Sequence, residues 1–395
     1  MPAPILQLFQ RPGMIELSWG HPDPAFLPVA ALSRAGAAAL DQFGADAMQY
    51  GHPAGPGPLL DWLAERIGRQ EGRIPAADEI MTTGGISLGL DQLLTSLLVP
   101  GDTVLVESPT YHLAVRILRD HRLNLVPVPS DEGGLRLDAF QHTLARLRAA
   151  GDRPRALYLV PTFNNPTGRS LAQDRRQGLV DLAAAERLLI IEDDVYRELA
   201  YDGPAPPSLW SLAPPGVVAR LGSFSKSLGP GLRLGWLTAG ADLVQDIVES
   251  GLLDSGGGVN HYTALVVTAL CAAGDYDSNL IALRQGYRAR RDALLASLRD
   301  HLPPGFTVRP PGGGFFVWVE LPTGADSRAL LPLAERAGVS FLPGTRFHLD
   351  GGGQSALRVA FTLYPPDELA EAAQRLGAAA RDYAAATSLS AAGPA

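Results

Sequence analysis

Short apolar runs alternate with helical stretches through the middle of the chain. Four segments, residues 103–111, 156–168, 187–196 and 217–226, each join a run rich in Val, Ile or Leu to a polar or Gly/Pro-rich turn. Unbroken apolar runs of this length are typical of strands that are buried on both faces, as in a parallel sheet. Helical stretches such as residues 170–187 lie between them, which indicates βαβ units. This pattern predicts a large α/β domain.

The pattern changes near residue 284. Residues 283–302 have the spacing of a long amphipathic helix, and the apolar segments 305–321, 339–344 and 356–362 are typical of strands in a smaller sheet. We therefore expect two domains, in keeping with a length that is large for one hydrophobic core. The expected bounds are 1–40 for an N-terminal arm that completes the small domain, 41–283 for the large domain, 284–384 for a small α+β domain and 385–395 for a disordered tail.

Composition and charge narrow the classes of function. The chain has 395 residues, of which 46% are hydrophobic and 19% are charged, as in an ordinary globular protein. Its formal net charge of −8 disfavours nucleic acid and anionic membranes as main partners. The single cysteine, Cys271, excludes an intrachain disulfide and a cysteine-rich metal site, and we predict no metal ligands.

The sequence shows no signal-peptide pattern at its N-terminus and no apolar run of membrane-spanning length. We therefore expect a cytoplasmic protein with no membrane partner and no nucleic-acid partner.

Polar side chains interrupt the apolar runs where the predicted strands end. In an open parallel sheet, ligands bind outside the carboxyl ends of the strands. Side chains from four strand ends are therefore expected in one region. They are Glu107 and Tyr111 after the first run, Asn165 after the second, Asp193, Asp194 and Tyr196 after the third, and Ser223, Ser225 and Lys226 after the fourth.

A pair of glycines, Gly84 and Gly85, precedes a predicted helix and forms a candidate anion site. Backbone N–H groups at a glycine turn and at a helix N-terminus can bind a phosphate. A glycine pair before a helix is often only a turn, so a second phosphate ligand is needed to support this interpretation. Arg233 is the candidate for that ligand, seven residues after Lys226 and beyond a Gly-Pro-Gly turn.

Lys226 is the only lysine in the chain, and every other one of the 33 basic residues is an arginine. Arginine serves wherever only a positive charge is needed, because it is effectively never deprotonated. A lysine amine can lose its proton when it is buried or lies near other cations, and it can then attack a carbonyl carbon. Lys226 follows an apolar run, between two serines and before a glycine turn. This position favours a nucleophilic amine over a surface lysine retained by chance.

An ordered series of motifs runs through nearly the whole chain. The motifs are WGHPDPAFLP, MQYGHPAGPGPL, TTGG, VESPTYH, PTFNNPTG, IEDDVYREL, SFSKSLGPGLRLGW, PGGGFFVWVELP, FLPG and ALRVAFT. On these motifs the chain resembles the class I and II aminotransferases, which are fold-type-I pyridoxal-phosphate enzymes, and most of all their aminoadipate and kynurenine aminotransferase branch. The resemblance implies an α/β fold in which helices sandwich a mostly parallel seven-stranded sheet in the large domain, beside a smaller α+β domain.

The same resemblance implies pyridoxal 5'-phosphate as the cofactor and assigns residues to it. Lys226 forms the Schiff base with the cofactor aldehyde and then shuttles the proton of the substrate α-carbon. Asp193 pairs with the ring nitrogen and keeps it protonated, so that the ring accepts electrons. Asn165 and Tyr196 hydrogen-bond the phenolic oxygen, and Tyr111 stacks on the ring. The predicted catalytic residues are Lys226, Asp193 and Tyr196.

The resemblance also implies how the phosphate is held. Tyr50 reaches the phosphate of the neighbouring subunit's cofactor, so the protein is expected to be a homodimer with shared active sites. The related branch usually has Gly-Ser-Gln at the glycine turn, and this chain keeps the backbone donors there while it lacks two polar side chains. The other phosphate ligands are the Gly85 and Ile86 backbone amides together with Ser223, Ser225 and Arg233.

For the substrate, the resemblance implies that Arg358 binds the α-carboxylate through two hydrogen bonds, with Gly20 and Asn165 close to the same group. Arg358 lies in an alternating strand pattern, where an exposed surface arginine would be ordinary.

Other assignments have alternatives as well. Asp194 competes with Asp193 as the ring partner on spacing alone, although the family pattern favours Asp193. Tyr111 could be only a packed aromatic residue at a turn. His21 and His52 receive no chemical role, because most lone histidines are not catalytic.

Transamination is the leading hypothesis for the function. The amino group of an L-amino acid would pass to a 2-oxo acid in a ping-pong cycle, and the sequence does not identify the amino acid. The alternative is a PLP-dependent lyase, decarboxylase or oxidase of specialised biosynthesis on the same fold. The unusual loop of residues 255–262, expected near the substrate entrance, keeps this alternative open. A transcription regulator with an aminotransferase-like domain is disfavoured by the net charge and by a resemblance that spans about residues 15–384.

Overall fold

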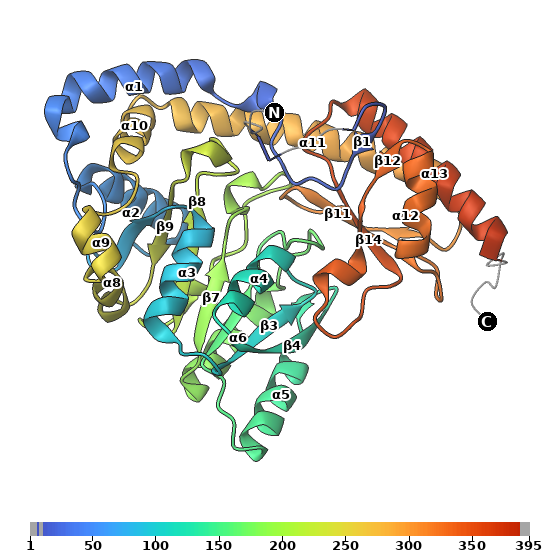
Figure 1. Cartoon of the computed structure of the whole chain (residues 1–395), viewed down its shortest axis with the longest axis horizontal. Coiled ribbons are helices and arrows are strands. Elements are labelled where there is room, and N and C mark those ends of the chain that lie inside the picture. Colours follow the sequence, from blue (N-terminus) through green and yellow to red (C-terminus); the bar gives the residue numbers. More distant parts are fainter. Residues whose placement is uncertain (1–5, 8–10, 388–395) are drawn as a thin grey trace, which may run out of the picture.

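A large mixed sheet forms the centre of the computed structural model, which describes residues 6–7 and 11–387 (Figure 1). Within this part of the chain the sheet has eight strands, in the order β2-β9-β8-β7-β6-β3-β4-β5. Strand β9 runs antiparallel to both of its neighbours, β5 is a two-residue strand antiparallel to β4, and the other neighbours pair in parallel. The predicted fold class is confirmed, and β5 is a short addition at the edge of the seven expected strands. The bounds are β2 Ile80–Thr83, β3 Thr103–Ser108, β4 Asn124–Asp131, β5 Gly134–Leu135, β6 Ala156–Leu159, β7 Leu189–Asp193, β8 Val218–Ser223 and β9 Gly235–Thr238.

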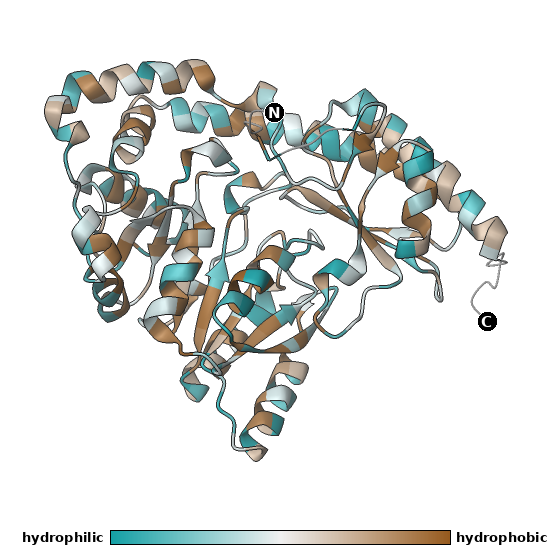
Figure 2. Ribbon diagram, viewed as in Figure 1, coloured by the Kyte–Doolittle hydropathy of each residue, from teal (hydrophilic) through white to brown (hydrophobic). Residues whose placement is uncertain are grey.

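Burial explains the unbroken apolar runs of these strands. Every residue of β3, β6 and β8 is buried, because helices cover the sheet and leave no face open to solvent. Figure 2 shows hydrophobic residues along the central strands and mixed hydropathy on the outer helices. The helices of this part are α1 Val29–Phe43, α2 Gly57–Glu71, α3 Ile86–Leu97, α4 His112–Asp120, α5 Leu137–Ala149, α6 Gln173–Glu186, α7 Leu209–Leu212, α8 Ala241–Val248, α9 Gly251–Gly256 and α10 His261–Ala272.

The smaller sheet is antiparallel, in the order β10-β11-β14-β13, and helices α12 and α13 lie beside it (Figure 1). The N-terminal strand β1 pairs in parallel with β12, so the start of the chain joins the C-terminal part. The bounds are β1 Ile15–Glu16, β10 Thr307–Val308, β11 Phe316–Glu320, β12 Val339–Ser340, β13 Leu342–Pro343, β14 Ala356–Ala360, α12 Ser327–Arg336 and α13 Pro366–Thr387.

Helix α11, Asp275–His301, connects the two parts (Figure 1). The domain boundary predicted at residue 284 falls inside this continuous helix, and the predicted domain bounds stay a prediction. Of the predicted tail, residues 385–387 end α13, and residues 388–395 lie outside the described part, as do residues 1–5 and 8–10 of the predicted arm. No helix of the described residues is long and apolar enough to cross a membrane.

The order of the strands locates a binding crevice. The chain passes from β3 to β4 on one side, and then returns to place β6, β7 and β8 on the other side of β3. Ligands of open α/β sheets bind at such a reversal, outside the carboxyl ends of the strands. Short 3₁₀ helices lie around this edge and elsewhere, at η1 Pro24–Phe26, η2 Gly44–Met48, η3 Arg197–Leu199, η4 Pro230–Leu232 and η5 Gly344–Phe347.

Candidate active site

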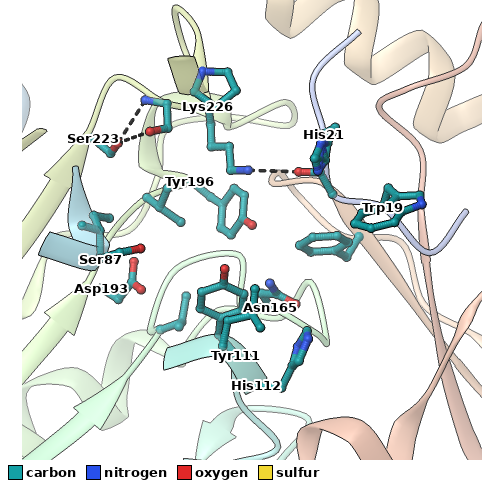
Figure 3. A pocket seen from close by; sticks show the side chains of 18 of the residues that line it. Trp19, His21, Ser87, Tyr111, His112, Asn165, Asp193, Tyr196, Ser223 and Lys226 are labelled. Carbon is teal, nitrogen blue, oxygen red and sulfur yellow. Dashed lines mark hydrogen bonds between the residues drawn. The ribbon is translucent and has the colours of Figure 1, made fainter. Parts of the chain in front are cut away.

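A cavity of about 480 Å³ lies at the carboxyl ends of the central strands and is also lined by residues of the N-terminal segment and the small sheet. Figure 3 shows Lys226 entering it from one side, with Tyr111 and Asn165 on the opposite side. Of the thirteen predicted site residues, only Gly85 and Tyr50 do not line this cavity. Those that do are Gly20, Ile86, Tyr111, Asn165, Asp193, Tyr196, Ser223, Ser225, Lys226, Arg233 and Arg358.

Lys226 follows β8 and points its amine across the cavity. Its Nζ donates a hydrogen bond to the Gly20 carbonyl oxygen at 3.0 Å and lies 5.2 Å from the centre of the Phe315 ring. Burial, together with the nearby Arg358 and Arg233 guanidinium groups, lowers the pKa of Lys226 to about 8. A lowered pKa makes the neutral, nucleophilic amine accessible near neutral pH.

Asp193 and Asp194 lie on opposite sides of the sheet edge. Asp193, at the end of β7, lines the cavity, whereas Asp194 faces away from it toward Arg197 and Arg220, at 2.5 and 2.8 Å. These two guanidinium groups also pair with Glu71 in a buried ionic cluster. Burial alone would raise the pKa of Asp194, but the charges of Arg197 and Arg220 outweigh it and the pKa is lowered. The alternative that Asp194 is the ring partner is therefore disfavoured, because its charge is already compensated inside the protein.

One oxygen of Asp193 has no hydrogen-bond partner among the described residues. Tyr158 Oη donates to Asp193 Oδ2 at 2.7 Å, while Oδ1 is buried and unpaired. Burial raises the pKa of Asp193 to about 6, and the Tyr158 hydroxyl and Lys226 oppose this rise. A buried carboxylate with one unpaired oxygen is costly alone, so it is suited to a cationic or N–H group of a ligand.

The start of α3, beside the cavity, has the features of an anion site. Gly85 has a left-handed φ of 81° and precedes Ile86, the first residue of α3, and no side chain caps this helix end. Arg233 Nη2 donates to the Gly84 carbonyl oxygen at 2.8 Å, directly beside this turn. A Cβ atom on Gly85 would lie 2.7 Å from Arg233 Nη2, so only glycine leaves this space open.

Two serines of the β8–Lys226 turn line the cavity as well. Ser223 Oγ donates to Ser225 Oγ at 2.9 Å and accepts from the Ser225 backbone N–H at 3.0 Å. Backbone amides, hydroxyls and a guanidinium group together are typical ligands of a phosphate.

Arg358 on β14 is a buried cation and is only 3% exposed. Its Nη1 donates to Asn165 Oδ1 at 2.9 Å and its Nη2 to the Ser18 carbonyl oxygen at 2.5 Å. It has no ion-pair partner among the described residues, its Nε is buried and unpaired, and burial lowers its pKa to about 10. The surface-arginine alternative is thus wrong, and the uncompensated charge is suited to a carboxylate.

Comparison with known proteins places the chain in a family. A family model described as aminotransferase class I and II matches residues 13–376. The 2-aminoadipate transaminase of Thermus thermophilus is 34% identical over 383 residues, which cover 95% of this chain and 92% of that protein. The chain belongs to the class I and II aminotransferases. It is therefore an enzyme that transfers amino groups.

Solved structures of aminotransferases share the whole fold. A multiple substrate aminotransferase from Thermococcus profundus has a TM-score of 0.90 and 32% identity, with 95% of this chain and 93% of that chain covered. The kynurenine aminotransferase of Pyrococcus horikoshii, solved in complex with PMP, has a TM-score of 0.89 and 31% identity, with 94% and 91% covered. These comparisons support amino-group transfer and give no support to the lyase alternative. For this aminotransferase the family implies pyridoxal phosphate.

The cavity of this aminotransferase fits that cofactor. Three cationic side chains, Lys226, Arg233 and Arg358, have no carboxylate partner among the described residues, and the one carboxylate, Asp193, has a free oxygen. An anionic phosphate matches the Gly85 end, and a cationic ring nitrogen matches Asp193 Oδ1. Within the described residues, no group of three or more His, Cys, Asp or Glu could hold a metal ion.

Tyr50 is 83% exposed and does not line the cavity of its own chain. The loop of residues 255–262 packs beside it: a Cβ atom on Gly257 would lie 2.9 Å from Tyr50 Cβ, and His261 Nε2 lies 3.2 Å from the Asp46 carbonyl oxygen. No residue of this loop lines the cavity of its own chain, and its place at the substrate entrance stays a prediction. The loop lies beside the Tyr50 segment, and Asn260 of the loop donates a hydrogen bond to the Arg233 carbonyl oxygen.

Several cavity residues were not found by sequence reasoning. The Arg358 guanidinium carbon lies 4.1 Å from the centre of the Phe316 ring. The His112 and Phe347 rings pack edge to face, with their centres 5.2 Å apart. Burial lowers the pKa of both His112 and His21 to about 4, so both rings are neutral near pH 7. His112 follows Tyr111 in the VESPTYH motif, which was a signal for its position, whereas Phe316 reaches the cavity only through the small sheet.

Proposed function

We propose that this aminotransferase binds pyridoxal 5'-phosphate in the cavity and moves the amino group of an L-amino acid to a 2-oxo acid in a ping-pong cycle. One observation carries the proposal: a lysine amine of lowered pKa, a carboxylate with a free oxygen and an anion-binding helix end line the same cavity. When bound, the cofactor supplies an aldehyde that condenses with amines and a ring that accepts electrons.

Lys226 is proposed as the residue that moves the proton. Its Nζ accepts the proton of the substrate α-carbon as a general base and later donates a proton as a general acid. A pKa of about 8 allows both the uptake and the release of a proton near neutral pH. The Gly20 carbonyl oxygen, 3.0 Å away, gives the amine a defined resting position.

Asp193 is proposed to keep the ring nitrogen protonated through its free Oδ1. Tyr196, Asn165 and Tyr111 all line the cavity and are proposed to hold the ring, the first two by hydrogen bonds and the third by stacking. Burial raises the pKa values of Tyr111 and Tyr196, so both hydroxyls remain hydrogen-bond donors at neutral pH.

The phosphate and the substrate carboxylate have separate proposed partners. The amides of Gly85 and Ile86, with Ser223, Ser225 and Arg233, are proposed to bind the phosphate. Arg358 is proposed to bind the α-carboxylate, with Asn165 Oδ1 and Gly20 beside it. Tyr50, exposed on its own chain, is proposed to complete the phosphate site of a partner subunit in a homodimer. The cytoplasmic location stays a prediction.

The experiment is a single half-reaction combined with labelling. Purified protein loaded with pyridoxal phosphate is reduced with borohydride, and peptide mass spectrometry is expected to find the adduct on Lys226. Unreduced enzyme mixed with an amino acid is expected to form one equivalent of pyridoxamine phosphate and of 2-oxo acid per site. An adduct at another residue would contradict the assignment of Lys226, and release of ammonia or carbon dioxide without pyridoxamine phosphate would contradict transamination.

A further inference from the structure

Tyr158 is a fully buried residue that contacts the proposed site without lining the cavity. Its hydroxyl donates to Asp193 Oδ2 at 2.7 Å, and the second oxygen, Oδ1, has no partner among the described residues. The two carboxylate oxygens of Asp193, a residue that lines the cavity, therefore have different surroundings: Oδ2 accepts from Tyr158, and Oδ1 is unpaired.

Strand register explains how Tyr158 comes to face Asp193. On β6, Tyr158 is in register with Ile191 of β7, and Asp193 is two residues further along β7. Side chains alternate along a strand, so Ile191 and Asp193 point to the same face of the sheet as Tyr158. Glu192 points to the other face, where it accepts hydrogen bonds from the Leu209 and Trp210 backbone N–H groups.

The direction of the hydrogen bond is determined by the surroundings of Tyr158. Burial and the Asp193 charge hold the pKa of Tyr158 well above its usual range, so its hydroxyl keeps its proton and donates it. The other titratable groups that interact electrostatically with Asp193 are Lys226, Tyr111 and Tyr196. Asp194 acts on it from the opposite side of the sheet edge, where Arg197 and Arg220 compensate its charge.

We propose that Tyr158 is a positioning residue whose hydroxyl holds one oxygen of Asp193, and thereby aims the other oxygen at the cationic ring nitrogen of the cofactor. The inference rests on the proposed function and names a residue that neither the motifs nor the cavity lining assigns. The hydroxyl acts in two ways. It orients the carboxylate, and it stabilises the ionised form, because a hydrogen bond to a charged acceptor is stronger than one to a neutral acceptor.

Removing only the hydroxyl, in Tyr158→Phe, tests this role. A hydrogen bond to a charged group is lost, so the affinity for pyridoxal phosphate and kcat of the half-reaction are each expected to fall about ten- to hundredfold, with KM for the amino acid changed little. The acid limb of the kcat profile is expected to move to higher pH. The reason is that Asp193 must be ionised to act, and without the donor its pKa rises.

Tyr383→Phe is the matched control. Tyr383 is buried, and its hydroxyl accepts a hydrogen bond from the Asp326 backbone N–H at 2.9 Å, far from the cavity lining. Equilibrium dialysis of the apoprotein with pyridoxal phosphate measures the affinity, and thermal unfolding of both apo variants measures the cost to the fold. If both variants lose affinity equally, or if Tyr158→Phe leaves affinity and the acid limb unchanged, the proposal is wrong.

A double-variant cycle separates positioning from simple packing. In an Asp193→Asn background, Tyr158→Phe is expected to cause no further loss of cofactor affinity, since the group through which it acts is gone. An additive loss would overturn the inference. Failure of the proposed function is distinguishable, because it would appear in the unaltered enzyme as the absence of cofactor binding or of pyridoxamine phosphate formation.

Discussion

Adjacent residues of this aminotransferase have different roles because strand geometry separates them. Asp193 and Asp194 are chemically identical and consecutive, and spacing alone left both as candidates for the ring partner, although the family pattern favoured Asp193. In the structure, Asp194 is paired with Arg197 and Arg220 and does not line the cavity, whereas Asp193 lines it and has no arginine partner among the described residues. The period of two along β7 could have favoured this assignment from the sequence, but the arginine partners could not be read there.

A prediction at the residue scale concerns Arg358. Replacing it in Arg358→Gln removes a buried cation that is proposed to bind the substrate carboxylate, so kcat/KM of the half-reaction is expected to fall about 100-fold. Cofactor affinity is expected to change much less, because Arg358 is not among the proposed phosphate ligands. Stopped-flow absorbance measures kcat/KM of the half-reaction, and equilibrium dialysis measures the cofactor affinity.

Arg336→Gln is the control for this change, since Arg336 is exposed at the end of α12. Equal losses in kcat/KM for the two variants would contradict the role of Arg358.

At the scale of elements, the start of α3 and the turn after β8 form one binding unit. The Gly84-Gly85 turn was expected from the sequence as a candidate anion site, and Arg233 was expected as its second ligand. The structure places them together: Arg233 Nη2 contacts the Gly84 carbonyl oxygen, although the two residues are 149 positions apart. Strands β2 and β8 both pair with β9, and this pairing carries the two turns to the same edge of the sheet.

Gly85→Ala is the prediction at this scale. The left-handed φ disfavours a side chain, and the new Cβ would lie 2.7 Å from Arg233 Nη2, so the guanidinium must move out of the anion site. The dissociation constant for pyridoxal phosphate is expected to rise at least ~10-fold, with a loss of about 1 kcal/mol in the unfolding free energy of the apoprotein.

Gly57→Ala provides the comparison. A Cβ atom on Gly57 would have no atom within 4 Å, and the φ of Gly57 lies outside the left-handed range. Unchanged cofactor affinity in Gly85→Ala would show that this turn does not bind the phosphate.

At the scale of the whole molecule, one surface has the character of an interface. Tyr50 is 83% exposed and Met48 73%, and Val29 on α1 and Leu252 on α9 are 69% and 63% exposed. Exposed apolar side chains that cluster on a surface are typical of association surfaces. Met48 and Tyr50 lie in one short segment beside Gly257 of the 255–262 loop, which supports the proposal that a second subunit covers this segment.

Mixing two inactive variants tests the shared site. A Lys226→Ala subunit keeps Tyr50, and a Tyr50→Ala subunit keeps Lys226, so a mixed dimer contains one complete site. Co-refolded variants are expected to recover roughly a quarter of the unaltered activity, from the statistics of random pairing in a twofold dimer. Sedimentation velocity checks the dimer itself. A monomer, or a mixture no more active than its components, would contradict the shared site.

From the sequence alone follow the α/β fold and eleven residues that line the cavity, and the motif resemblance implies the amino-group chemistry. The fold prediction depends on local signals, namely apolar periodicity, glycine turns and polar residues at strand ends. Only the tertiary structure decided which of these residues meet. Lys226 contacts Gly20 across 206 positions and Arg358 contacts Asn165 across 193, and Tyr158 faces Asp193 through strand register. Such contacts depend on how the strands and the two sheets pack, and the local sequence pattern does not determine that packing.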